Sequence, residues 1–291
     1  MGLGLVSGIL SGMFGVGGAI ITTPGIRLIL GGTAMDAVAT PLVGVIPSSI
    51  TGAYRYIKEG ITDWRFGLAV GLGGAAMGVL GAFIATSLGG TIVMVGTALV
   101  LLFSAAQTFF TIYKESKQEK AAEQSDAAEQ TGASAQSASH MQSDALTQSD
   151  EHALDADSEA PVHVAHTRLN YAKAVAIGAF TGVYAGFFGL GGGVIIVPAL
   201  NRFLNMNYKQ AIGTSLLSIS IISVPALAMH AYLGNVNWLL ALGLVVGVVP
   251  GAWVGAKITV GASERATSIG FAVLLIVTGI WLGVSEVLGI R

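Results

Sequence analysis

Residues 12–18 are Gly12-Met13-Phe14-Gly15-Val16-Gly17-Gly18, and residues 186–193 are Gly186-Phe187-Phe188-Gly189-Leu190-Gly191-Gly192-Gly193. Both stretches interrupt long apolar segments. A glycine inside a helix costs about 1 kcal/mol relative to alanine, so this glycine density predicts a break in each helix. In membrane hydrocarbon such a break persists only where protein or a wet cavity covers the freed backbone groups.

The composition indicates a protein that crosses a membrane several times. Of its 291 residues, 53% are hydrophobic and only 10% are charged, and the mean hydropathy is +0.73; soluble domains carry roughly 25% charge. Residues 115–167 hold 11 acidic residues and two lysines, a net charge of −9, while the rest of the chain has a net charge of +7. We therefore expect a first membrane repeat at 1–113, an acidic disordered cytoplasmic linker at 114–168 and a second membrane repeat at 169–291.

The two membrane regions repeat one another at an offset of 174 residues, without a gap. The matched positions include Gly15 with Gly189, Pro24 with Pro198, Thr40 with Thr214 and Trp64 with Trp238. Such a repeat implies one structural unit used twice, related by a pseudo-twofold axis. Segments long enough to span lipid lie at 36–57, 66–88, 91–113, 209–232, 237–259 and 266–288, and the two broken segments lie at 3–30 and 171–203.

The positive charges distinguish two topologies. If each broken segment crosses the membrane once, one side receives nine Lys and Arg residues and the other receives five. If each is a re-entrant hairpin with limbs of about 12 residues, rising about 18 Å, only Arg27 and Arg291 fall apart from the other 12. Cytoplasmic loops carry the Lys and Arg excess, which favours the second topology. We predict an all-α polytopic membrane protein with two inverted repeats, each a glycine-broken re-entrant segment plus three transmembrane helices, with both termini outside.

The hairpin tips would then meet near the membrane midplane. A helix N-terminus carries about half a positive charge, and glycine lets a ligand approach the backbone closely. The tips therefore predict a small anion site without a buried lysine or arginine, walled by phenylalanines and supplied with hydroxyl donors from the following helices. The predicted substrate-binding residues are Phe14, Gly15, Gly17, Gly18, Thr40, Phe188, Gly189, Gly191, Gly192, Gly193, Thr214 and Ser215.

Other polar residues in the membrane regions allow simpler interpretations. Asp36, at the start of a segment, is typical of a helix cap. His230, near the outer end of its segment, leaves a proton-coupling role open, and Ser49 and Ser223 match each other further along the helices of the two threonines. Gly-x-x-x-Gly spacing also occurs where membrane helices pack closely, so packing remains an alternative for the glycines. We expect no enzyme, metal site or cofactor, because the sequence shows no Ser-His-Asp set, paired carboxylates or His-x-x-x-His helix.

These residues resemble the sulfite exporter TauE/SafE family over both halves of the chain. The likeness rests on the two glycine stretches with Pro24 and Pro198, on Ala211-Ile212-Gly213-Thr214-Ser215-Leu216 and on Gly234-Asn235-Val236-Asn237-Trp238. The resemblance implies a bacterial or archaeal inner-membrane protein that moves small sulfur-containing anions, such as sulfite or organosulfonates, usually outward.

We therefore expect a secondary transporter that works by alternating access around the paired tips. The expected partners are a small anionic substrate and the lipid bilayer, and no nucleic acid; proton or sodium coupling and homo-oligomerisation stay open. The same residues could build a passive small-anion channel. A third possibility is a non-transporting membrane scaffold that acts through the acidic linker.

Overall fold

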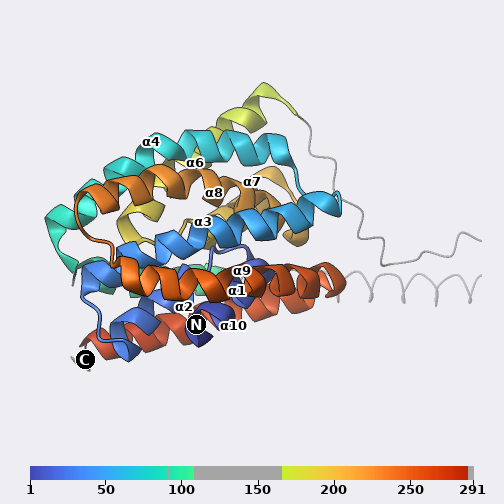
Figure 1. Cartoon of the computed structure of the whole chain (residues 1–291). Coiled ribbons are helices and arrows are strands. Elements are labelled where there is room, and N and C mark those ends of the chain that lie inside the picture. Colours follow the sequence, from blue (N-terminus) through green and yellow to red (C-terminus); the bar gives the residue numbers. More distant parts are fainter. Residues whose placement is uncertain (91, 108–165, 288–291) are drawn as a thin grey trace, which may run out of the picture. The chain divides into compact units, whose positions relative to one another are not determined.

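The computed structural model describes residues 1–90, 92–107 and 166–287, and within these ranges every regular element is a helix. The end of the first predicted repeat and residues 114–165 of the predicted linker lie outside the described residues. Residues 166–168 of that linker are described, and Arg168 already begins a helix. The elements are α1 (Gly2–Phe14), α2 (Ala19–Pro24), the π-helical turn η1 (Gly25–Ile29), α3 (Ala34–Lys58), α4 (Trp64–Leu88), a helix over Ile92–Gln107, α6 (Arg168–Phe188), α7 (Gly193–Leu204), α8 (Tyr208–Tyr232), α9 (Trp238–Gly261) and α10 (Glu264–Val287). Figure 1 shows them packed side by side.

The repeat reappears in the helix boundaries. Helices α3 and α8 are offset by 174 residues at both ends, and the ends of α1 and α6 share this offset, as do the starts of α2 and α7. The caps repeat as well. Thr33 caps α3 and Asn207 caps α8, while Asp63 caps α4 and Asn237 caps α9. Asp36 completes a capping box with Thr33, which confirms its predicted role.

Close glycine contacts determine the relative directions of the helices. Along α1 and α9 the contacting positions rise together, from Gly4 against Leu244 to Gly12 against Ala252, so these helices run parallel. The same reasoning makes α4 parallel to α6 and to α8, because α4 residues 70–78 meet α6 residues 178–186, and residues 67–78 meet α8 residues 217–226. Contacts of α3 with the start and the later part of α9 make that pair parallel too.

Two groups of helices follow from these directions. Connections over 59–63 and 233–237 reverse the chain after α3 and after α8. Helices α1, α3 and α9 therefore run one way, and α4, α6 and α8 run the other. Helices α1, α3 and α4 thus run opposite to their equivalents in the other repeat, α6, α8 and α9. Inversion with respect to a membrane stays a prediction, and these directions support it.

The first broken segment folds back on itself. The Ser7 hydroxyl donates to the Gly18 carbonyl over 2.6 Å, and a Cβ atom placed on Gly25 would lie 2.6 Å from Leu3 Cδ1. The segment therefore enters and leaves at one end of the bundle. Hairpin 1 denotes residues 2–29, and hairpin 2 denotes residues 168–204.

The limb lengths correct one expectation. Limbs of about 12 residues hold for α1 with 13 and for α7 with 12, but α6 has 21 and is itself long and apolar enough to span a membrane. The reason is that residues 168–175 correspond to positions ahead of Gly2. The other helices of spanning length are α3, α4, α8, α9 and Arg265–Val284 within α10, as predicted. Of the predicted 91–113 span, the described helix is Ile92–Gln107.

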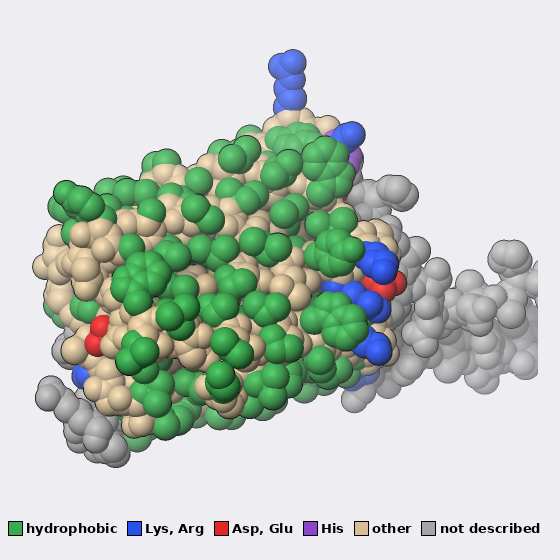
Figure 2. Space-filling model, in the orientation of Figure 1, with side chains coloured by type: hydrophobic (Ala, Val, Ile, Leu, Met, Phe, Trp, Pro, Cys, Tyr) green, Lys and Arg blue, Asp and Glu red, His purple; other side chains and the backbone are tan. Residues whose placement is uncertain are grey.

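The surface of the described helices is largely apolar, with bases gathered at one end (Figure 2). Exposed hydrophobic side chains are spread along α4, α9, α10 and the helix Ile92–Gln107. Arg55 and Lys257 both lie over the ring of Trp253, at the ends of α3 and α9. A large exposed apolar surface marks contact with lipid or another apolar partner. The described chain is thus a multi-pass membrane protein whose central part is covered on all sides by helices.

Candidate functional site

Each glycine-rich break is a tight backbone turn. Tip 1 denotes residues 15–18 and tip 2 denotes residues 189–192. Gly15, Gly17 and Gly18 have φ values of 70°, 74° and 78°, and their equivalents in tip 2 have values of 67°, 74° and 86°. Residues with a Cβ atom rarely adopt this left-handed conformation. The breaks predicted from glycine density therefore exist, and the same positions in both repeats make them.

The two tips touch at the centre of the fold. A Cβ atom placed on Gly193 would collide with the carbonyl oxygen of Gly15 and lie 2.6 Å from Val16 Cα. Val45 and Ile219, the twelfth residues of α3 and α8, lie beside the contact. A Cβ atom on Gly191 would lie 3.1 Å from Val45 Cγ1 and 3.2 Å from Ile219 Cγ2. The glycines thus allow two backbones to meet midway along the two central helices.

The helices that leave the tips begin without a cap. Gly18 precedes α2 and Gly192 precedes α7, and neither N-terminus receives a side-chain hydrogen bond. By contrast, side chains cap α3, α4, α6, α8 and α9. The amides of residues 16–20 and 190–194 also have no hydrogen-bond acceptor in the described part of the chain. Buried N–H groups are nearly always paired in proteins. Ten unpaired donors at one junction therefore indicate a site that can bind a hydrogen-bond acceptor, such as an anion.

Hydroxyl groups hold the carbonyl oxygens of hairpin 1. Ser7 donates to Gly18, Ser48 to Gly17, Ser215 to Gly15, Tyr56 to Gly12 and Thr259 to Met13 over 2.6–3.3 Å. Ser48 and Ser215 share their single proton with a carbonyl of their own helix, Val45 at 2.9 Å and Ile212 at 2.8 Å. The positions equivalent to these donors hold Thr181, Ile222, Pro41, His230 and Ala85. Thr181 bonds carbonyls of its own helix. Among these five residues, His230 is the one with a hydrogen bond from another helix to hairpin 2, through Nε2 at 2.9 Å from the Gly186 carbonyl. The backbone symmetry of the tips is therefore not matched by their side-chain ties.

His230 has hydrogen-bond partners on both ring nitrogens. Its Nε2 faces a carbonyl oxygen, so this nitrogen carries the proton. Its Nδ1 lies 3.3 Å from Nδ2 of Asn235, which donates to Thr86 over 2.8 Å. Proton coupling through His230 stays a prediction, and the observed role is to hold hairpin 2.

The predicted threonines lie at helix starts. Thr40 accepts the amide of Asn237 over 3.1 Å, and Thr214 accepts the amide of Asp63 over 3.2 Å. Each threonine therefore ties the cap residue of a helix from the other repeat. Ser215, one residue further along, does reach tip 1. In this structure the oxygen atoms of both threonines accept backbone amides. Substrate binding by these threonines stays a prediction.

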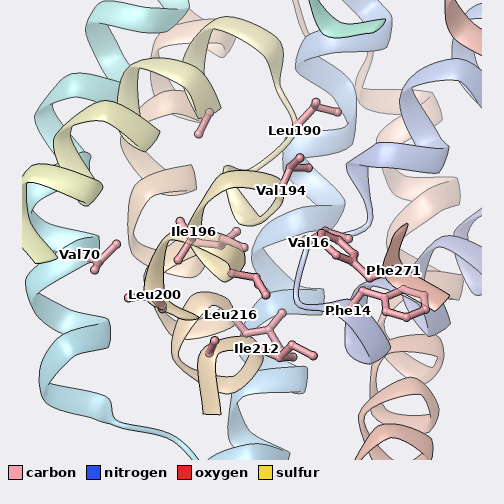
Figure 3. Packing of buried hydrophobic residues seen from close by; sticks show 14 of the residues in the cluster. Phe14, Val16, Val70, Leu190, Val194, Ile196, Leu200, Ile212, Leu216 and Phe271 are labelled. Carbon is pink, nitrogen blue, oxygen red and sulfur yellow. The ribbon is translucent and has the colours of Figure 1, made fainter. Parts of the chain in front are cut away.

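The predicted phenylalanines contact the last helix of the opposite repeat. Figure 3 shows Phe14 beside Phe271 of α10, and their ring centroids are 6.0 Å apart. A Cβ atom on Gly270 would lie 3.1 Å from Phe14, and one on Gly96 would lie 2.9 Å from Phe188. The structure does not bring these rings together between the tips, and a role in walling the site stays a prediction.

Sequence reasoning missed the residues that surround the tips. Val45 and Ile219 were available through the 174-residue offset, because they match each other in the middle of equivalent helices. The contacts of Ser7 and Ser48 could not be predicted, because a sequence does not show which carbonyl oxygen a buried hydroxyl will bond. Within the described ranges, no three His, Asp or Glu side chains are close enough to hold a metal ion.

Taken together, the helices of spanning length and the paired tips define a multi-pass α-helical membrane protein with a central, donor-rich junction. Residues 1–282 match the family described as "Sulfite exporter TauE/SafE". The chain therefore belongs to the TauE/SafE family of membrane transporters.

Several relatives carry transporter names. A "Probable membrane transporter protein" of Xylella fastidiosa is 26% identical over 285 residues, which cover 97% of this chain and 93% of the relative. "Probable membrane transporter protein YdhB" of Bacillus subtilis is 27% identical over 255 residues, covering 87% and 86%. "Probable membrane transporter protein YunE" of the same organism is 25% identical over 263 residues, covering 88% and 84%. No solved structure matches the chain significantly.

Proposed function

We propose that this protein is a secondary transporter that exports small sulfur-containing anions, such as sulfite or organosulfonates. The observation that carries the proposal is the meeting of two buried, uncapped helix starts in the centre of the fold. Their amides and helix dipoles favour an anion without a buried cationic side chain. The family description supplies the chemical class and the outward direction.

Transport would proceed by alternating access. The tips are in direct backbone contact in this structure, so an anion could reach their amides only when one hairpin moves away from the other. The hairpins come from opposite ends of the bundle, and movement of either one would open a path to its own end. The arrangement of broken helices around a midplane site is typical of secondary transporters.

The proposed location is a bacterial cytoplasmic membrane, with the basic end and the linker in the cytoplasm. Nine described Lys and Arg residues lie near the ends of helices that meet at this end, and Arg27 lies near the opposite end. Cytoplasmic loops carry such an excess of positive charge.

Transport in sealed vesicles tests the proposal. The full chain would be reconstituted, the vesicles loaded with radiolabelled sulfite, and its exit measured. Unlabelled sulfite outside should accelerate the exit of label, because exchange returns a loaded carrier faster than an empty one. Sulfite flux that ignores external sulfite and all proton and sodium gradients would instead indicate a passive channel. If no sulfite or methanesulfonate crosses above protein-free vesicles, the transporter proposal is wrong.

A scaffold that acts through the acidic linker is the remaining candidate. It predicts that a variant lacking residues 118–160 loses its cellular function. Vesicle transport at the wild-type rate by this variant, together with retained function in cells, would contradict the scaffold.

A further inference from the structure

Two buried serines near the tips have no hydrogen-bond partner. Ser49 and Ser223 are equivalent residues of α3 and α8, and both are fully buried. Neither hydroxyl oxygen has a partner among the described residues. A serine inside a helix usually bonds a carbonyl of its own preceding turn, as Ser220 does with Leu217. A buried hydroxyl that forgoes this bond in both repeats indicates a partner that is not part of the chain.

Their position places them beside the tips. Ser49 follows Val45 by four residues, and Ser223 follows Ile219 by four, so each serine shares a helix face with its apolar neighbour. A Cβ atom on Gly17 would lie 2.8 Å from Val45 Cγ1 and 3.4 Å from Ile219 Cγ2. Side chains four residues apart on a helix are roughly 5–6 Å apart at Cβ. Both serines therefore lie within one helical turn of the residues that touch the tips.

The helices that begin at the tips are long enough for their dipoles to favour an anion at their N-termini. Helix α7 has 12 residues, and α2 continues into η1 as one helical run over Ala19–Ile29. Their amides are donors without acceptors, whereas the hydroxyls of Ser48 and Ser215 already donate to carbonyls of tip 1. The unused donors near the junction thus include the tip amides and the hydroxyls of Ser49 and Ser223. Thr23 of α2 and Tyr184 of α6 also have hydroxyls without a partner, but Ser49 and Ser223 are the pair related by the repeat.

We propose that Ser49 and Ser223 bind the substrate, each donating a hydrogen bond to an oxygen atom of an oxyanion held between the tips. This inference rests on the proposed transport function and assigns its specificity. Two donors on different helices, related by the repeat, suit a ligand that presents several acceptor oxygens. A tetrahedral sulfonate and a pyramidal sulfite each present three such oxygens, and we expect them to bind more tightly than a halide ion.

Binding and stability measured on the same variants test the assignment. The full chain in detergent would be titrated with sodium sulfite, sodium methanesulfonate and sodium chloride, and affinity derived from the rise in melting temperature. Ser49→Ala and Ser223→Ala should each weaken sulfite and methanesulfonate binding about tenfold. The ligand-free melting temperature should stay level or rise, because each change removes a buried hydroxyl without a partner. Ser220→Ala, which removes a hydroxyl bonded within α8, is the matched control and should bind as wild type.

The outcomes separate the two proposals. If wild type binds both oxyanions and neither alanine variant differs from it, the serine assignment is wrong while the transporter proposal stands. A lower ligand-free melting temperature with unchanged affinity would show a structural role and also overturn the assignment. If chloride stabilises wild type as strongly as sulfite, the proposed preference for oxyanions is wrong. If no anion binds wild type and no vesicle transport is seen, both proposals fail. Because Ser49 and Ser223 lie on different helices, each variant tests the assignment even if the other does not fold.

Discussion

Single residues at the tips combine two constraints, a left-handed backbone and a close neighbour. Gly17 has both, with φ of 74° and Val45 beside it, whereas Gly234 has φ of 73° and nothing within 4 Å of an added Cβ atom. The two glycines therefore form a natural pair in which backbone strain is equal and only the surroundings differ.

Replacing each glycine by alanine separates strain from position. Gly234→Ala should lower the free energy of unfolding by about 1–2 kcal/mol and leave sulfite transport intact. Gly17→Ala should lose the same amount through strain and abolish transport as well, because its methyl group lies against Val45 where the tips meet. Thermal unfolding and vesicle flux measure the two effects. Equal transport by the two variants would remove tip 1 from the mechanism.

At the scale of single residues, sequence predictions succeeded where the local backbone accepts few residue types. The tip glycines needed positive φ, and Asp36 preceded by Thr33 formed the expected cap. The predictions were incomplete for Thr40 and Thr214, because a threonine hydroxyl can form a hydrogen bond with any nearby donor or acceptor. The structure shows those hydroxyls on the cap amides of α9 and α4, a pairing between residues about 150–200 positions apart that no local pattern contains.

Among the elements, the contacts of parallel helix pairs explain many of the glycines outside the tips. Along α9, Gly247, Gly251 and Gly255 face the α1 backbone at intervals of four residues. Such spacing lets two backbones approach closely in lipid. The sequence alone left close packing and ligand binding as alternatives for Gly8 and Gly12, and here these residues pack against Val248 and Ala252. Glycine spacing alone therefore cannot distinguish a glycine that packs two helices together from a glycine that forms a tip. The contacts in the structure make this distinction.

Two glycines of α9 should respond oppositely to alanine. Gly251→Ala places a methyl group 2.9 Å from the Ile9 amide nitrogen, and it should destabilise the fold by roughly 1–3 kcal/mol. Gly243→Ala meets nothing within 4 Å and should be neutral or stabilising by up to about 1 kcal/mol, since alanine favours the helix. Denaturation midpoints of the two variants measure this difference. Two variants of the same stability would contradict the parallel packing of α1 on α9.

The two hairpins should also differ in mobility. Four hydroxyls from other helices bond carbonyls of hairpin 1, and Ser7 links its two limbs. Among the equivalent residues, His230 bonds hairpin 2 from another helix, and Thr181 bonds only within its own helix. Local opening should therefore cost less in hairpin 2, and its tip amides should exchange with deuterium faster than those of tip 1. Ser215→Ala should narrow this difference by removing one tie worth about 1 kcal/mol. Thr278→Val, which removes a hydroxyl bonded within α10, should not. Equal exchange in both wild-type tips would show that the hydroxyls do not anchor hairpin 1.

Across the whole molecule, the central claim is that two copies of one unit point in opposite directions. The repeat itself was predictable, because a gapless offset of 174 residues over both halves is visible in the sequence, and so was the end that collects the bases. The length of α6 was not predictable from that offset. Residues 168–175 of α6 have no equivalent residues in α1, which begins at Gly2. Helix directions needed contacts between the halves, which a single sequence does not contain.

A pair of equivalent loop glycines tests the inversion directly. Gly60 follows α3 and Gly234 follows α8; they are related by the repeat, have φ values of 71° and 73°, and have open space around them. The chain contains no cysteine, so a single introduced thiol is the sole target of a maleimide reagent. In intact cells, a membrane-impermeant maleimide should label Gly234→Cys. Gly60→Cys should react only after the cells are permeabilised, because its loop lies at the basic end. Labelling of both cysteines from outside, or of neither, would mean that the repeats are parallel, and the two tips could then not approach each other from opposite faces of the membrane.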